Sequence, residues 1–202
     1  NNVSSPDTGF ITDLMDDNGV LTGYGIAVVD SFNNINRSGS SNPDPALGFP
    51  PTATGDSFFG NVTPFGGQTQ PTGAVELFNL DTNFVYTLSI YAARNGVNDV
   101  REAQYAVAGR GLDTVYLDAS NNDSTLVVAQ MVPDTSGVIR ITASPGPNNT
   151  NGSGFYYLGL MKMTWERRPP EFVKDTILVD FGPNASPLPW NNIADPNAGS
   201  IA

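Results

Sequence analysis

The stretch Phe84-Val85-Tyr86-Thr87-Leu88-Ser89-Ile90-Tyr91 places Tyr86, Leu88 and Ile90 at every second position. In an extended strand, side chains at alternate positions point to opposite faces of the sheet. This period of two predicts a half-buried β-strand, because an amphipathic helix would need apolar residues three and four positions apart. The segment therefore favours a β-sheet fold.

Similar runs, each bounded by Gly, Pro or Asn, recur along the chain. Their spacing of about 8–12 residues is typical of a β-sandwich or jelly roll. Only residues 10–16 could form a helical turn, and the proline-rich residues 38–55 are expected to be a long loop. The prediction is an all-β jelly-roll sandwich with strands over residues 23–32, 74–79, 84–94, 101–109, 114–118, 124–132, 138–143, 155–166 and 176–181.

The composition argues against several functions. The 202 residues carry nine basic and 20 acidic side chains, with a net charge of −11. Nucleic acids and anionic membranes require clustered Lys and Arg, and no apolar run of about 18 residues predicts membrane insertion. The chain has no His and no Cys, so the commonest general base and the strongest nucleophile are missing. We expect no catalytic residues, no organic cofactor and no enzyme activity.

Two consecutive prolines, Pro169 and Pro170, follow the predicted strand over residues 155–166. Because proline lacks an N–H donor, this pair stiffens a linker and cannot join a sheet. We predict a jelly-roll module over residues 1–168, a Pro-rich linker over residues 169–175, and the first strand and loop of a next module over residues 176–202.

A short duplication supports this boundary. Residues 1–12 and 191–202 share an Asn pair, a Pro, a Gly and an Ile in the same register, although an asparagine-rich chain can produce such a match by chance. If the duplication is real, the first module lacks the counterpart of residues 176–182. That strand could come from a neighbouring copy, the chain's own C-terminus or upstream sequence. The residues of this assembly segment are Ile177, Leu178, Val179, Phe181 and Trp190.

A family resemblance agrees with the modular reading. Val179-Asp180-Phe181-Gly182, followed by Pro189-Trp190-Asn191-Asn192, resembles the opening of a jelly-roll module found in large secreted and surface proteins of bacteria. Residues 25–32, 49–59, 86–91, 105–109, 117–122, 132–134 and 156–160 are similar to the rest of that module, in permuted order. The resemblance implies a galactose-binding-like β-sandwich and an extracellular or cell-surface location, and it supplies no catalytic residue.

Calcium is the small ligand that the sequence favours. Asp13, Asp16, Asp17 and Asn18 cluster before Gly19, and hard oxygen ligands at short spacing suit Ca²⁺. A second cluster surrounds Asp118 and Asp123. The alternative is a solvated turn in which Asp and Asn accept hydrogen bonds from backbone amides.

Sugars could be attached to the chain or bound by it. Candidate attachment sites, from Asn-x-Ser/Thr and Asp-Ser/Thr motifs, are Asn2, Asn36, Asn61, Asn122, Asn148, Asn151, Asn184, Thr114, Ser124 and Thr176. Candidate aromatic residues for stacking on a bound sugar are Tyr24, Phe58, Phe59, Phe155, Tyr156 and Trp190, although large aromatics more often fill a sandwich core.

The leading hypothesis is a structural or adhesive repeat of an extracellular fibre, assembling head-to-tail with further copies of itself, with strand donation as one route. The alternative is a carbohydrate-binding module of a secreted hydrolase, with glycans as partners.

Overall fold

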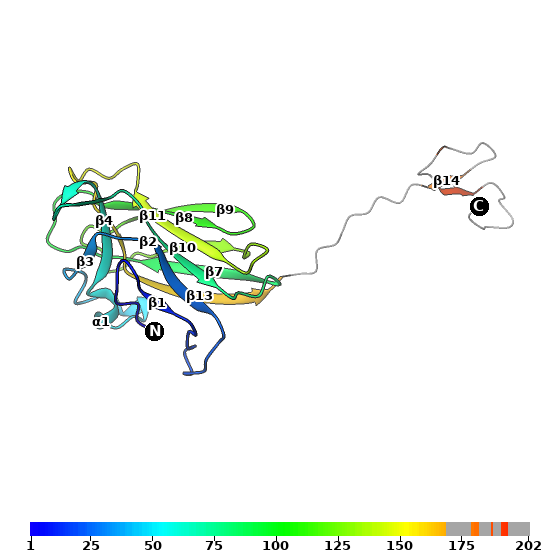
Figure 1. The fold of residues 1–202 in the computed structure, drawn as a ribbon, viewed down its shortest axis with the longest axis horizontal. Coiled ribbons are helices and arrows are strands. Elements are labelled where there is room, and N and C mark those ends of the chain that lie inside the picture. The colour runs from blue at the N-terminus through cyan, green and yellow to red at the C-terminus, as the bar shows by residue number, and fades with distance from the viewer. Residues whose placement is uncertain (169–178, 182–186, 188–190, 194–202) are drawn as a thin grey trace. The chain divides into compact units, whose positions relative to one another are not determined.

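The computed structural model describes residues 1–168, 179–181, 187 and 191–193 (Figure 1). The chain divides into two units, Asn1–Arg168 and Pro169–Ala202. In the second unit, β14 (Val179–Phe181) pairs in parallel with β15 (Asn191–Ile193). The other strands and helices all belong to the first unit.

One layer of the first unit is a six-stranded antiparallel sheet. The strands lie in the order β1–β2–β6–β11–β8–β9, so segments far apart in the sequence are neighbours. Their bounds are β1 (Phe10–Ile11), β2 (Gly25–Asp30), β6 (Gly73–Phe78), β11 (Ile139–Pro145), β8 (Glu102–Ala108) and β9 (Leu112–Asp118).

The second layer consists of two groups of strands. One has the order β10–β7–β13, and the other has the order β12–β4–β3, with β5 paired to β4. Gly159 alone separates β12 from β13, and a Cβ atom there would lie 2.7 Å from the Tyr91 carbonyl oxygen at the end of β7. Glycine at position 159 thus permits the chain to pass from β12, which pairs with β4, to β13, which pairs with β7. The bounds are β10 (Val127–Met131), β7 (Phe84–Tyr91), β13 (Leu160–Arg167), β12 (Tyr156–Leu158), β4 (Ser57–Phe65), β3 (Asn34–Asn36) and β5 (Gln68–Gln70).

A single hydrophobic core fills the space between the layers. Tyr86, Leu88 and Ile90 of β7 are fully buried, as their alternation predicts. A hydrogen bond of 2.6 Å from the Tyr105 hydroxyl on β8 to the Tyr157 carbonyl on β12 joins the two layers. The all-β sandwich prediction is confirmed.

Several local predictions need correction. Residues 10–16 form no helical turn: β1 begins at Phe10, and Gly19 (φ +79°) allows the chain to fold back on itself, so that Met15 bridges to Leu21. Strands β3, β4 and β5 were not predicted, since Gly and Pro interrupt the pattern along β4. The strand expected over residues 155–166 is divided at Gly159.

Helices are few and short. The predicted loop over residues 38–55 contains η1 (Pro45–Leu47) and α1 (Pro51–Thr54), each of one turn. Across the described part of the chain, no helix combines the length and the apolar character needed to cross a membrane.

The close approach of β4 and β12 yields a test of the core. Gly60 faces the buried Tyr156, and a Cβ atom at position 60 would overlap the Tyr156 ring and hydroxyl. We expect Gly60→Ala to lower the free energy of unfolding by about 1–3 kcal/mol, because overpacking forces side chains out of their preferred positions. Urea unfolding measures the effect. Gly111→Ala is the matched control, since nothing lies within 4 Å of its added Cβ; equal effects of the two variants would contradict the packing argument.

Candidate functional site

Neighbouring aromatic residues on β4 and β12 lie on opposite faces of the second layer. Phe58 and Tyr156 face the core, where their ring centroids are 5.5 and 6.3 Å from that of Phe32. Phe59 and Tyr157, which pair directly across the two strands, point to the other face, where Phe59 is half-buried and Tyr157 is buried. The alternation that builds the core therefore also places aromatic rings on the second face of the sheet, where neighbouring side chains cover most of their surface.

Two further rings complete an aromatic cluster, defined as Phe59, Phe65, Phe155 and Tyr157. The Phe65 and Phe155 centroids are 5.0 Å apart, and Phe59 lies 5.6 Å from Phe155 and 6.0 Å from Phe65, all edge to face. This is the arrangement that aromatic pairs prefer. Phe65 nevertheless keeps 49% of its surface exposed. The cluster is thus ordered by its own contacts, and Phe65 is its exposed member, because Phe59 and Phe155 are half-buried and Tyr157 is buried.

The aromatic cluster lines a hollow of about 460 Å³, here named the aromatic hollow. β3, β4 and the segments before β12 and after β7 surround it. The other lining residues are Asn34, Ile35, Asn36, Arg37, Ser38, Arg94 and Arg101.

Arg101 is fixed beneath the aromatic cluster by three contacts. Its Nε lies 3.0 Å from Asp99, its Nη1 donates to the Tyr157 hydroxyl at 2.5 Å, and its guanidinium carbon is 5.4 Å from the centroid of the Phe155 ring. The Nδ2 of Asn151 donates to the other carboxylate oxygen of Asp99. Arg101 therefore serves to hold Phe155 and Tyr157 in place.

The charges of this network shift two pKa values. The hydrogen bond from Asn151, assisted by Arg101, holds the pKa of Asp99 below its ordinary 3.8. Burial raises the pKa of the Tyr157 hydroxyl, and the positive charges of Arg101 and Arg94 act in the opposite direction. At neutral pH the network therefore consists of an ionised ion pair and a neutral phenol.

Arg37 and Arg94 differ from Arg101. Within the described residues, neither guanidinium makes a hydrogen bond or an ion pair. Their backbones are nonetheless anchored. The N–H of Arg94 donates to the Ala119 carbonyl at 2.6 Å, and the residue before Arg37, the buried Asn36, donates to Ser57 Oγ and the Ala93 carbonyl. The two cationic side chains thus extend from fixed positions.

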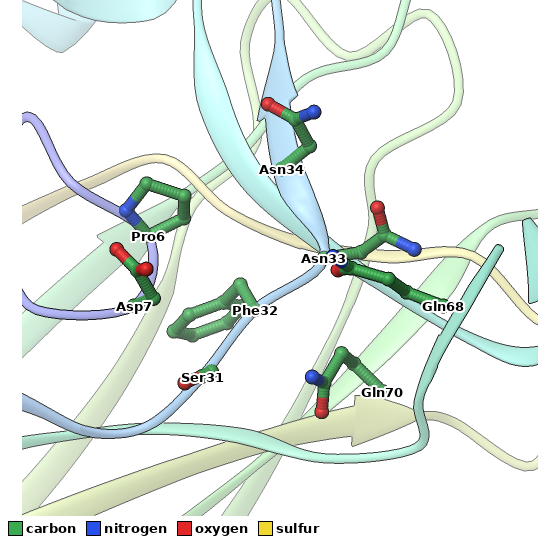
Figure 2. Close-up of a pocket in the computed structure, with 8 residues that line it drawn as sticks. All are labelled: Pro6, Asp7, Ser31, Phe32, Asn33, Asn34, Gln68 and Gln70. Carbon is green, nitrogen blue, oxygen red and sulfur yellow. The ribbon is translucent and has the colours of Figure 1, made fainter. Parts of the chain in front are cut away.

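A second hollow of about 330 Å³ lies at the beginning of β3, and Asn34 lines both hollows. Figure 2 shows Pro6 and Asp7 on one side of Phe32 and Gln68 and Gln70 on the other. We name it the amide hollow, because its lining residues are Pro6, Asp7, Ser31, Phe32, Asn33, Asn34, Gln68 and Gln70. Asn33 connects it to the aromatic cluster by donating to the Phe65 carbonyl at 3.0 Å.

The residues predicted to bind calcium stabilise their own loop. Asp13 accepts the N–H of Gly23 at 2.8 Å, and one oxygen of Asp16 accepts the N–H groups of Asn18 and Val20. These hydrogen bonds, that from Val20 above all, lower the pKa of Asp16. Asp17 accepts a hydrogen bond from Asn18. No three His, Cys, Asp or Glu side chains in the described ranges come together as a metal site, and calcium binding stays a prediction.

Three candidate glycosylation sites are buried. The amides of Asn36, Asn61 and Asn122 are 8%, 0% and 7% exposed, and each donates two hydrogen bonds inside the domain. Attaching a glycan would break these bonds in the folded state. Among the other candidates, Asn2, Asn148 and Ser124 are exposed, Asn151 and Thr114 are half-buried, and Asn184 and Thr176 lie outside the described residues.

The remaining predicted residues divide similarly. Of the aromatic candidates, Phe59 and Phe155 belong to the aromatic cluster, whereas Phe58 and Tyr156 face the core. Tyr24 packs against Tyr86 and Trp165. Sequence reasoning missed Phe65, Tyr157 and the three arginines. In the assembly segment, Val179 and Phe181 belong to β14, and Ile177, Leu178 and Trp190 lie outside the described residues.

Comparisons with known proteins identify no family. No family model matches the chain, and no curated protein matches its sequence. Among solved structures, the extracellular domain of ANXUR1 from Arabidopsis thaliana is similar with 9% sequence identity and a TM-score of 0.48. The similarity covers 81% of this chain and 54% of that chain, so this chain spans about half the length of the structure it matches. The resemblance to a bacterial jelly-roll module rests on the sequence motifs alone.

The Asp99 network predicts a pH dependence of stability. Because the pKa of Asp99 is lowered on folding, its ionised form stabilises the fold at pH values above 3.8, and this contribution is lost as the pH falls through the folded-state pKa. We expect Asp99→Asn to lower the melting temperature at neutral pH and to approach wild type at the acid end of a titration from about pH 6 to 2. Asp17→Asn controls for the removed charge. A constant difference between wild type and Asp99→Asn across the titration would contradict the coupling.

Proposed function

We propose that the first unit is a non-catalytic, carbohydrate-binding module of an adhesive extracellular or cell-surface protein. The observation that carries this proposal is the aromatic cluster, in which the half-exposed Phe65 lies on the partly buried rings of Phe59 and Phe155. Large aromatic side chains of a sandwich usually fill the core, so an ordered Phe ring that stays exposed beside a hollow suggests a ligand. Their rings offer flat apolar surfaces to the C–H groups of a sugar ring.

The polar groups around the aromatic cluster support the same ligand class. Sugar hydroxyls both donate and accept hydrogen bonds, and side-chain amides provide both functions within one group. Asn34 lies between the two hollows, and Gln68 and Gln70 line the amide hollow. An apolar surface flanked by a few polar groups is the usual composition of a small-molecule site. An oligosaccharide that reaches from one hollow to the other would meet both kinds of contact.

Phe65 provides the direct test. We expect Phe65→Ala to weaken glycan binding about 10-fold, because it removes an aromatic contact, and to leave the fold intact, because Phe65 is 49% exposed. A glycan array identifies a bound sugar, and calorimetry then measures its affinity. Leu112→Ala is the control, since Leu112 is an exposed apolar residue on β9, outside both hollows. A folded wild-type protein that binds no glycan on the array would contradict the proposal.

The fibre hypothesis is the second candidate, and the edge of β13 favours it. β13 extends over eight residues and pairs with β7 along one edge. Within the described residues, no strand pairs with its other edge. An unpaired edge of this length is a template for an added strand. Residues 176–182 of a second copy would supply that strand, in agreement with the duplication seen in the sequence.

Assembly is tested on the full chain by light scattering after size exclusion and by negative-stain electron microscopy. We expect filaments from the wild type and uniform particles from Leu178→Asp, since a charge in the donated strand opposes its burial against β13. Leu112→Asp should leave the filaments intact. Uniform particles of about 21.4 kDa from the wild type would overturn the fibre hypothesis and leave carbohydrate binding untouched.

A further inference from the structure

Positive charge is concentrated at the aromatic hollow. The chain has only nine basic residues against 20 acidic ones, yet three of the nine, Arg37, Arg94 and Arg101, line this hollow. No Asp or Glu is among the described residues that line it. The carboxylate of Asp99 forms an ion pair with Arg101 and accepts a hydrogen bond from Asn151. The aromatic hollow is therefore a cationic site on an acidic protein.

The three arginines have different roles. Arg101 is already paired with Asp99 and bonded to Tyr157, so it positions the aromatic rings. Arg37 and Arg94 have no such partner within the described residues, although both line the hollow. A guanidinium presents a planar fork of N–H donors that fits a carboxylate or a sulfate group. Two unpaired guanidinium groups beside an aromatic surface are complementary to an anion attached to a sugar ring.

We infer that the aromatic hollow binds an acidic sugar, whose carboxylate or sulfate group is held by Arg37 and Arg94 while its ring packs against the aromatic cluster. This inference deepens the proposed carbohydrate binding and rests on it. The amides of Asn34 and Gln68 contact the hydroxyls of the same ring or of the next one. Neutral sugars lack the anion and bind more weakly.

The acidity of the rest of the domain makes binding depend strongly on these two residues. A net charge of −11 repels anions at long range, so no general attraction compensates for the loss of a short-range contact. A basic protein would bind many polyanions without selectivity. Here the anion is favoured only at the hollow that Arg37 and Arg94 line, which selects for an acidic group correctly placed on the sugar.

The experiment compares three probes of equal length by calorimetry at low salt: an oligogalacturonate, the neutral galacto-oligosaccharide and a galactose 6-sulfate oligosaccharide. We expect Arg37→Gln combined with Arg94→Gln to weaken binding of the acidic probe about 10- to 100-fold. The control combines Arg110→Gln with Arg140→Gln, which changes the net charge equally. Arg110 lies outside both hollows, and Arg140 pairs with Glu76 within the six-stranded sheet, also outside both hollows. Thermal unfolding of each variant confirms that it is folded.

The outcomes separate the inference from the proposed function. Tighter binding of an acidic probe that is lost only in the Arg37 and Arg94 variant supports the inference. A preference for the sulfated over the carboxylated probe, with the same loss, also supports it and identifies the anion. Equal binding of the neutral and acidic probes overturns the inference while carbohydrate binding stands. Weakening by the control variant to the same extent also overturns it. Failure of every probe and of the glycan array contradicts both proposals.

Discussion

The opposite orientation of neighbouring side chains at Phe58 and Phe59 of β4 and at Tyr156 and Tyr157 of β12 is the constraint on which both the core and the site depend. Each strand carries two adjacent aromatic residues, and a pleated strand sends them to opposite faces. Phe58 and Tyr156 close the core against Phe32, while Phe59 and Tyr157 line the aromatic hollow. A shift of register by one residue would exchange the two pairs between the faces of the sheet and remove Phe58 and Tyr156 from their contacts with Phe32. Packing of the core thus fixes the geometry of the hollow.

The sequence was sufficient for the fold class because the central strands alternate regularly. Along β7, the fully buried Tyr86, Leu88 and Ile90 are the residues that a period of two selects. The same reasoning failed for β4, where Gly60 and Pro64 interrupt the pattern. Gly60 is required there because its missing Cβ makes room for the Tyr156 ring, a contact almost a hundred residues away in the chain. Such a requirement has no local signature, so sequence reasoning saw a break where the structure has a strand.

The site was predicted only in part for a related physical reason. The adjacent aromatics could be found in the sequence, but which member of each pair faces outward depends on the register with the neighbouring strands. Both helices and all of β4 to β7 lie between Arg37 and Arg94 in the sequence, so only the folded chain brings the two residues to one hollow. Asparagine also has a structural use, in which its buried amide satisfies backbone hydrogen-bonding groups. Asn36, Asn61 and Asn122 have this use and nevertheless match glycosylation motifs. A motif of three residues does not distinguish these two uses.

The hollow and the β13 edge are formed by different residues, so carbohydrate binding and fibre assembly are compatible. A hollow that holds one or two sugar units would bury little surface. The affinity of one such hollow for a sugar would therefore be modest. The anchored backbones at Arg94 and Asn36 reduce the entropy lost on binding, yet they add no contact area. If the proposed fibre forms, repetition would supply what one site lacks: joined copies would bind a repeating polysaccharide at many points, and the effective concentration of each further site would raise the overall affinity by orders of magnitude. In such a proposed assembly, a weak and selective hollow would be preferable to a tight one, because it would discriminate between polymers and still allow individual contacts to exchange.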